Sequence, residues 1–197
     1  MHVGEWEVSQ SRMRSVLNWA VLIFAVIGWN SNASGQELIP AGSTWKYWDQ
    51  GTLPASWSQA DFDDSAWPSG PAQLGCGEND EITVMGRTES SHARTLCFFR
   101  HEFSMQAAEE ADQILLRWLV DDGAVFYLNG QEIHRAYMPA GELSDETRAR
   151  SGHYVRAENR WDQTWLPKHL LQPGRNTLAV AVYQINETSS DVSFDLR

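Results

Sequence analysis

The residues in this sequence whose types could support chemistry begin with its two cysteines. Cys76 and Cys97 are 21 positions apart, and the chain has no other cysteine. In an oxidising compartment such a pair predicts a disulfide bond, and closing a loop of this size would stabilise the fold by about 3 kcal/mol. The alternative is two buried thiols that pack as small apolar side chains.

A second candidate is the segment Asp121-Asp122-Gly123, which stands between two apolar runs. Adjacent aspartates with a nearby carbonyl or amide oxygen can bind Ca²⁺, a hard cation that prefers oxygen ligands. The alternative is turn chemistry, in which the aspartates stabilise a bend and the glycine adopts a positive φ. The sequence leaves both interpretations open, and calcium is the only cofactor that it suggests.

Aromatic side chains form the third candidate group, because the chain contains 10 tryptophans. Trp161 and Trp165 fall in the least regular stretch, residues 139–165, and Tyr137 is close by in sequence. Exposed aromatic rings on loops can stack on sugar rings, so these three residues are the predicted ligand-binding side chains. The alternative is that they fill the core or pin a loop, which is the interpretation we favour for Trp45, Trp67 and Trp118.

Sequence motifs for common catalytic centres are missing. The chain has no H-E-x-x-H, C-x-x-C, G-x-S-x-G, P-loop or G-x-G-x-x-G pattern. Its many carboxylates do not single out the pair that a glycosidase needs. We therefore expect a protein that is not an enzyme and has no catalytic residues.

Composition narrows the class of protein further. Acidic residues outnumber basic ones 26 to 15, for a net charge of −11, and 42% of the residues are hydrophobic. A nucleic-acid-binding protein would show a basic excess or stripe, so we expect no nucleic-acid partner. The apolar content is sufficient for a folded core.

Residues 1–35 have the layout of a secretory signal peptide. Two arginines precede a 14-residue apolar run, Val16–Trp29, and small residues follow it. A membrane-spanning helix needs about 20 apolar residues, so we expect export without a stable membrane anchor. Met13 could be the true start, and an uncleaved signal anchor is the alternative. The expected location is secreted, periplasmic or in the cell envelope.

The elements that must position the candidate residues are β-strands. Apolar and polar residues alternate with period two in five segments, which predicts strands with one face in a core. The inward residues of these runs are Cys97, Phe99, His101 and Phe103; Ile114, Leu116, Trp118 and Val120; Ala124, Phe126 and Leu128; Leu178, Val180 and Val182; and Val192, Phe194 and Leu196. Asn129-Gly130 predicts a two-residue type I′ hairpin turn. Residues 36–197 are therefore predicted to form one all-β antiparallel sandwich.

Three sequence segments add a family resemblance to this pattern. They are Phe62-Asp63-Asp64-Ser65-Ala66-Trp67 with Leu74-Gly75-Cys76-Gly77, then Phe99-Arg100-His101-Glu102-Phe103, then Val120–Gly130 with Leu171–Asn176. Together they resemble the galactose-binding-domain-like β-sandwich, or jelly roll, an accessory domain of secreted bacterial hydrolases of planctomycete type. A similar Asp-Asp-Gly segment occurs in PA14-type sandwiches, where paired aspartates help hold calcium and sugar. The resemblance implies that Phe62 and Trp67 plug one end of the sandwich.

These observations predict a secreted, non-catalytic binding or accessory module whose partner is a carbohydrate or cell-surface polymer. The alternatives are a structural or protein-interaction domain of the cell envelope, or an accessory fragment of a secreted hydrolase such as a metallophosphoesterase. Fold resemblance alone does not choose among them, because one fold hosts many functions. The oligomeric state is not determined by the sequence.

Overall fold

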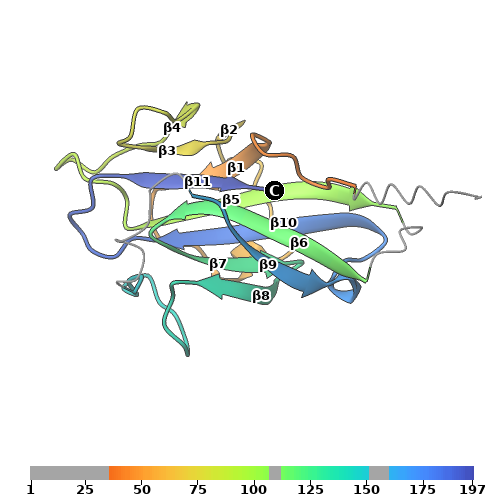
Figure 1. Cartoon of the computed structure of the whole chain (residues 1–197). Coiled ribbons are helices and arrows are strands. Elements are labelled where there is room, and N and C mark those ends of the chain that lie inside the picture. Colours follow the sequence, from red (N-terminus) through yellow and green to blue (C-terminus); the bar gives the residue numbers. More distant parts are fainter. Residues whose placement is uncertain (1–35, 107–111, 151–159) are drawn as a thin grey trace, which may run out of the picture. The chain divides into compact units, whose positions relative to one another are not determined.

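The computed structural model describes residues 36–106, 112–150 and 160–197 (Figure 1). The predicted signal peptide, residues 1–35, lies outside the described residues. The structure is 44% strand and 5% helix, with the strands in two sheets, which confirms the predicted all-β sandwich. Within the described ranges, no helix is long and apolar enough to cross a membrane.

The larger sheet, here called sheet A, has six antiparallel strands in the order β2-β1-β5-β10-β7-β8. Its strands are β1 (Thr44–Trp48), β2 (Ser69–Pro71), β5 (Leu96–Met105), β7 (Gly123–Leu128), β8 (Gln131–Ala136) and β10 (Gly174–Tyr183). The two ten-residue strands β5 and β10 lie side by side at its centre (Figure 1).

The smaller sheet, sheet B, has the order β4-β3-β11-β6-β9. Its strands are β3 (Leu74–Cys76), β4 (Thr83–Val84), β6 (Gln113–Asp121), β9 (Asp162–Pro167) and β11 (Val192–Leu196). All neighbours pair antiparallel except β3 and β4, which are parallel. The described helical turns are two short 3₁₀ helices, η1 (Ala55–Ser58) and η2 (Lys168–Leu170).

The main core fills the space between the two sheets, and it contains the residues that alternation assigned to it. Leu116, Trp118 and Val120 of sheet B meet Phe126 and Val180 of sheet A in one buried cluster. Phe99 and Phe194 stack across the sheets with ring centroids 3.9 Å apart and an interplanar angle of 12°. Each buried aromatic ring removes about 150–250 Å² from water, so this contact layer dominates the stability of the sandwich.

The predicted hairpin between β7 and β8 is confirmed. Asn129 and Gly130 have φ values of 51° and 84°, as a type I′ turn requires, and Leu128 pairs with Gln131 across it. The Asn129 side chain also accepts a hydrogen bond from the Thr177 amide at 2.9 Å, which ties the turn to β10. Local sequence therefore fixes this hairpin and tertiary contacts reinforce it.

Sheet A carries a second core on its outer face, which the sequence did not predict. Trp57, Trp67 and Phe98 are buried there, and the partly buried Phe62 packs against them. The expectation that Phe62 and Trp67 plug one end of the sandwich is therefore wrong. They lie instead in the segment after β1 and cover the outer face of sheet A, because the small side chains of Ala179 and its neighbours leave room for large rings.

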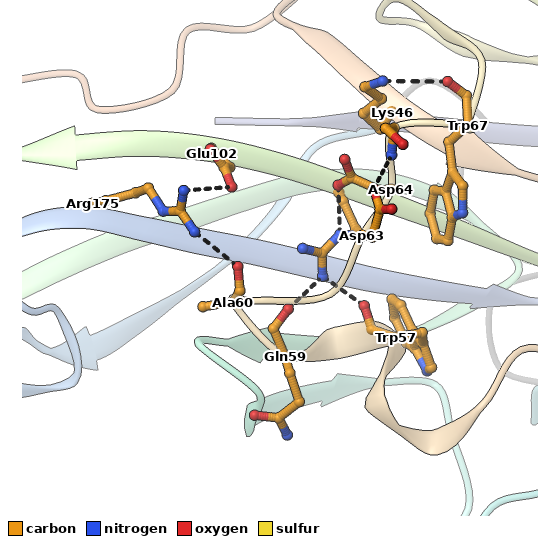
Figure 2. A network of polar contacts seen from close by, with 11 residues as sticks. Lys46, Trp57, Gln59, Ala60, Asp63, Asp64, Trp67, Glu102 and Arg175 are labelled. Carbon is orange, nitrogen blue, oxygen red and sulfur yellow. Dashed lines mark hydrogen bonds and ion pairs between the residues drawn. The ribbon is translucent and has the colours of Figure 1, made fainter.

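A buried arginine of β5 holds this covering segment on the sheet (Figure 2). Arg100 is 1% exposed; its Nε donates to the Asp64 carboxylate at 2.8 Å. Its Nη1 donates to the carbonyls of Trp57 at 2.6 Å and Gln59 at 2.9 Å. The guanidinium carbon also lies 5.4 Å from the centre of the Phe62 ring. One cation thus fixes the C-terminal end of η1 and the Asp64 turn.

The stretch 139–165 is less irregular than the sequence suggested. Its last residues enter β9, so Trp165 lies in a strand and not in a loop. A short helical turn, η2, follows β9 and begins after Pro167. The local sequence around Trp165 lacks clear alternation, and its strand forms because β6 supplies hydrogen-bonding partners along the whole length of β9.

Candidate functional site

The outer face of sheet B is the candidate site, and β6 and β9 form it. Leu116 and Leu166 point into the main core. Because side chains alternate along a strand, Leu115 and Trp165 point to the opposite, outer side. These two residues are direct cross-strand partners, so their side chains are neighbours.

Trp165 is the most unusual residue of this face, because its large ring is 58% exposed. Leu115 beside it is 37% exposed. Strand β9 is the edge of sheet B, so no strand of the described structure pairs with it on its other side. We call the surface formed by Leu115, Trp161, Gln163 and Trp165 the tryptophan face.

The other end of the same sheet face is covered by the protein itself. Asp195 and Ser193 of β11 are buried, although alternation places both on the outer side. The Asp195 carboxylate accepts hydrogen bonds from the amides of Gly42 and Leu196. Burial raises the pKa of Asp195, while these two bonds and the charge of Arg197 act in the opposite direction. The β11 part of the face is therefore covered, whereas the β6–β9 part leaves Leu115 and Trp165 exposed.

Trp161, the second predicted stacking residue, is half-buried and already has a partner. The guanidinium carbon of Arg197 lies 5.1 Å from the centre of its ring, a cation–π contact. Trp161 precedes β9, and Arg197 follows β11, so the contact spans the outer side of sheet B. Trp161 therefore borders the tryptophan face with part of its ring covered by Arg197.

Tyr137, the third predicted residue, does not join this face. It follows β8 at the edge of sheet A, with a φ of 58°, and its ring packs against the core between the sheets. Its hydroxyl donates a hydrogen bond to the carboxylate of Asp162. Asp162 pairs with Trp118, whose side chain points inward, so Tyr137 links the two sheets on the core side. The structure thus brings Trp161 and Trp165 together and places Tyr137 apart.

The bend Asp121-Asp122 connects β6 of sheet B with β7 of sheet A. The Asp122 carboxylate accepts a hydrogen bond from the Ile185 amide at 2.8 Å, and Gln184 donates to the Asp121 carbonyl at 2.9 Å. Burial raises the pKa of Asp121 to about 8, with further contributions from the charges of Asp122 and Asp191. At neutral pH the Asp121 side chain is therefore mostly a neutral acid in this structure.

Gly123 completes the bend for a different reason from the one expected. It is not among the residues with positive φ. A Cβ atom at this position would lie 2.8 Å from Ala149 Cβ and 2.8 Å from Met138 Sδ. Close packing against the second core, and not a left-handed backbone, requires glycine here.

The structure offers only some of the oxygen ligands that the predicted calcium site would need. Asp121 and Asp122 supply oxygen atoms beside a sheet-to-sheet bend, but within the described part of the chain no group of three or more His, Cys, Asp or Glu is arranged to hold a metal ion. Calcium binding therefore stays a prediction from the sequence. Calorimetry with Ca²⁺ and with EDTA measures calcium binding. The absence of both a binding heat and a shift in melting temperature would contradict it.

The predicted disulfide is not formed in this structure, in which Cys76 and Cys97 are free thiols. Cys76 belongs to β3 and Cys97 to β5, so the two thiols enter the main core from opposite sheets. Burial raises the pKa of both, and the charge of Asp49 and the proximity of Cys76 raise that of Cys97 further. Both are neutral and pack as small apolar groups. Oxidation of this pair in an exported protein stays a prediction, which alkylation and mass spectrometry of the unreduced protein would test.

Gln163 of the tryptophan face and the two neighbouring arginines, Arg117 and Arg197, were missed from the sequence. Arg117 pairs with Gln163 on the neighbouring strand. Arg117 and Arg197 exchange backbone hydrogen bonds of 2.8 and 2.9 Å. The alternation of residues 113–120 already placed Arg117 on the outer side. Its neighbours could not be found, because nothing local says which strands flank β6.

No protein-family model matches the chain, and the search of curated proteins finds no match either. Among solved structures, a β-glucuronidase of Bifidobacterium dentium complexed with coumarin-3-O-glucuronide is 15% identical with a TM-score of 0.47, covering 75% of this chain and 20% of that chain. A calcium-binding mutant of Bacteroides uniformis β-glucuronidase 2 is 17% identical with a TM-score of 0.49, covering 81% of this chain and 18% of that chain. A β-glycosidase of Bacteroides vulgatus is 13% identical with a TM-score of 0.48, covering 82% of this chain and 20% of that chain.

This chain therefore spans about a fifth of the length of these three proteins. Identities below 20% and TM-scores below 0.5 do not establish what the chain binds or does.

Proposed function

We propose that the protein is a non-catalytic carbohydrate-binding module of an exported protein, and that it acts as an accessory domain. The observation that carries the proposal is the exposed ring of Trp165 on a sheet face that also presents Leu115 and Gln163. Export rests on the sequence pattern of residues 1–35.

An exposed tryptophan on a sheet is suited to a sugar. A pyranose ring has an apolar side of C–H groups, which an indole ring can cover while the hydroxyl groups stay in contact with water or polar side chains. Leu115 widens the apolar area, and the exposed amide of Gln163 two residues away on the same side can bond a hydroxyl. The arrangement supplies both parts of such a recognition surface.

The buried charged side chains supply the argument for a non-catalytic role. Arg100 binds Asp64, Asp122 binds the Ile185 amide and Asp195 binds the Gly42 amide. Each of these groups has a partner inside the protein and stabilises a segment of the chain. A screen on aryl glycosides and phosphate esters should therefore give no turnover.

A glycan array probed with the full chain tests the carbohydrate-binding proposal. The Trp165→Ala variant should lose about tenfold or more of the affinity for any glycan that the array identifies, because the stacking ring is gone. Ile82→Ala is the matched control: Ile82 is 68% exposed but lies in the segment before β4.

The Ile82→Ala variant should bind like the unaltered protein. A blank array with cooperatively melting protein would contradict carbohydrate binding. It would favour the envelope protein-interaction domain that the sequence left as an alternative.

A further inference from the structure

The outer face of sheet B carries two arginines next to the tryptophan face. Arg197, just after β11, lies beside Arg117 of β6, which lies beside Gln163 of β9, since Arg117 pairs with both of the others. Residues paired directly across strands present their side chains on the same side. The pair Arg117–Gln163 is the next pair along β6 and β9 on the same side as Leu115–Trp165. The two guanidinium groups therefore lie beside Leu115 and Trp165.

The two cations are not neutralised by ion pairs of the described structure. Ion pairs between described residues join Arg100, Arg135, Arg148 and Arg175 to carboxylates, and none includes Arg117 or Arg197. The Nε atoms of Arg117 and Arg197 are buried without a hydrogen-bond partner in the described part of the chain. The nearest acid on β11, Asp195, is committed to the Gly42 and Leu196 amides.

This pair contrasts with the rest of the molecule. The whole chain has 26 acidic and 15 basic residues, so a basic patch does not arise from composition. A guanidinium group presents a planar fork of donors that matches a carboxylate or a sulfate in two parallel hydrogen bonds. A cation beside an exposed indole ring therefore combines the two contacts that an acidic sugar requires.

Building on the proposed carbohydrate-binding function, we infer that the ligand is an anionic polysaccharide. Trp165 stacks on a sugar ring, and Arg117 binds the acidic group of that sugar or of its neighbour. Arg197 adds positive charge to the same row while it stacks on Trp161. The acidic group is a planar carboxylate of a uronic acid or a sulfate ester, since the oxygen atoms of both accept hydrogen bonds from the guanidinium fork.

Two pairs of probes, each an acidic oligosaccharide and its uncharged derivative, test the inference by calorimetry on the full chain. One pair is oligogalacturonate and its methyl ester, and the other is a sulfated galactan oligosaccharide and its desulfated form. We expect the acidic member of at least one pair to bind about tenfold or more tighter than its uncharged partner. The pair that shows the preference identifies the acidic group as carboxylate or sulfate.

Variants test whether Arg117 causes the preference for the acidic probe. Arg117→Gln should remove the difference between the acidic and the uncharged probe. Arg175→Gln, which deletes an exposed arginine of sheet A, should preserve it. Arg117→Lys retains the charge and the aliphatic stem; it should bind the acidic probe at least about threefold more weakly, because the bidentate fork is lost. A thermal melt of each variant verifies folding.

The outcomes separate this inference from the proposal beneath it. Equal binding of charged and uncharged probes would overturn the anionic ligand and leave carbohydrate binding intact. A preference that survives in Arg117→Gln would overturn the role of this arginine. No binding of any probe, together with a blank glycan array, would overturn both the anionic ligand and the carbohydrate-binding function.

Discussion

Asp121 is the residue that gives this fold a distinct dependence on pH. Burial, followed by the charges of Asp122 and Asp191, raises its pKa from the ordinary value of 3.8 to about 8. In the unfolded chain the group loses its proton near pH 4, whereas the folded protein retains it until about pH 8. Unfolding releases a proton in this window, so the stabilising contribution is full below pH 4 and is lost as the pH rises to about 8.

The Asp121→Asn variant should remove this part of the pH dependence. The amide is neutral at every pH, so the contribution of up to about 1.4 kcal/mol per pH unit disappears between pH 4 and 8. Urea unfolding at pH 5, 6.5 and 8 measures the slope. Glu89→Gln, at an exposed position, is the control and should retain the slope of the unaltered protein. Identical slopes in the unaltered protein and Asp121→Asn would contradict the buried neutral acid.

Trp165 shows how one residue acquires its significance from its position on a strand. An isolated exposed apolar side chain needs no explanation, but a ring 58% exposed on the regular face of an edge strand is a large apolar surface. Its neighbour Leu115 continues the surface onto β6. Residue type alone predicted stacking for three aromatic residues, and exposure distinguishes Trp165 from the other two.

At the scale of elements, one buried ion pair helps to hold the segment between β1 and β2 on sheet A. Arg100 is buried in sheet A and Asp64 is its only carboxylate partner among the described residues (Figure 2). A buried cation that loses its partner charge costs more than the pair contributes, because desolvation of the guanidinium is no longer offset. Substitution of Asp64 therefore tests whether this ion pair holds the second core in place.

The Asp64→Asn variant should lower the free energy of unfolding by about 3–5 kcal/mol. Urea unfolding measures the loss, and faster proteolysis of the segment 53–68 would localise it. Glu102→Gln removes the partner of Arg175 in an exposed pair 3.6 Å apart, and it should cost at most about 1 kcal/mol. Equal losses in the two variants would contradict the argument from burial.

At the scale of the whole molecule, the two sheets are covered unequally. Sheet A has the main core on one face and the second core on the other, whereas the β6–β9 part of sheet B leaves Leu115 and Trp165 exposed. The two roles therefore fall to different regions: the cores on sheet A provide stability, and the uncovered β6–β9 part of sheet B is available to a ligand.

This division predicts that stability and binding respond to different substitutions. Phe194→Ala removes the ring that stacks on Phe99 in the main core. It should cost about 3–5 kcal/mol and lower the melting temperature by roughly 6–20 °C. Calorimetric binding measured below the new melting temperature should match that of the unaltered protein. A loss of affinity in folded Phe194→Ala would contradict the division.

The sequence by itself determined the strand faces and the hairpin. Side chains in a strand alternate with period two, so the order Ile114, Leu116, Trp118, Val120 specifies an inner face without knowledge of any partner. Asn129-Gly130 is equally local, because positive φ is a property of the two residues themselves.

Only the tertiary structure decided which strands lie side by side. The pairing of Leu115 with Trp165 and of Arg117 with Arg197 joins residues 50 and 80 positions apart. Such pairings depend on how all the apolar faces pack at once, and no local pattern encodes them. The raised pKa of Asp121, the burial of Arg100 and the charged row beside Trp165 are consequences of that packing, because a side chain's electrostatic surroundings come from segments that the fold brings to it.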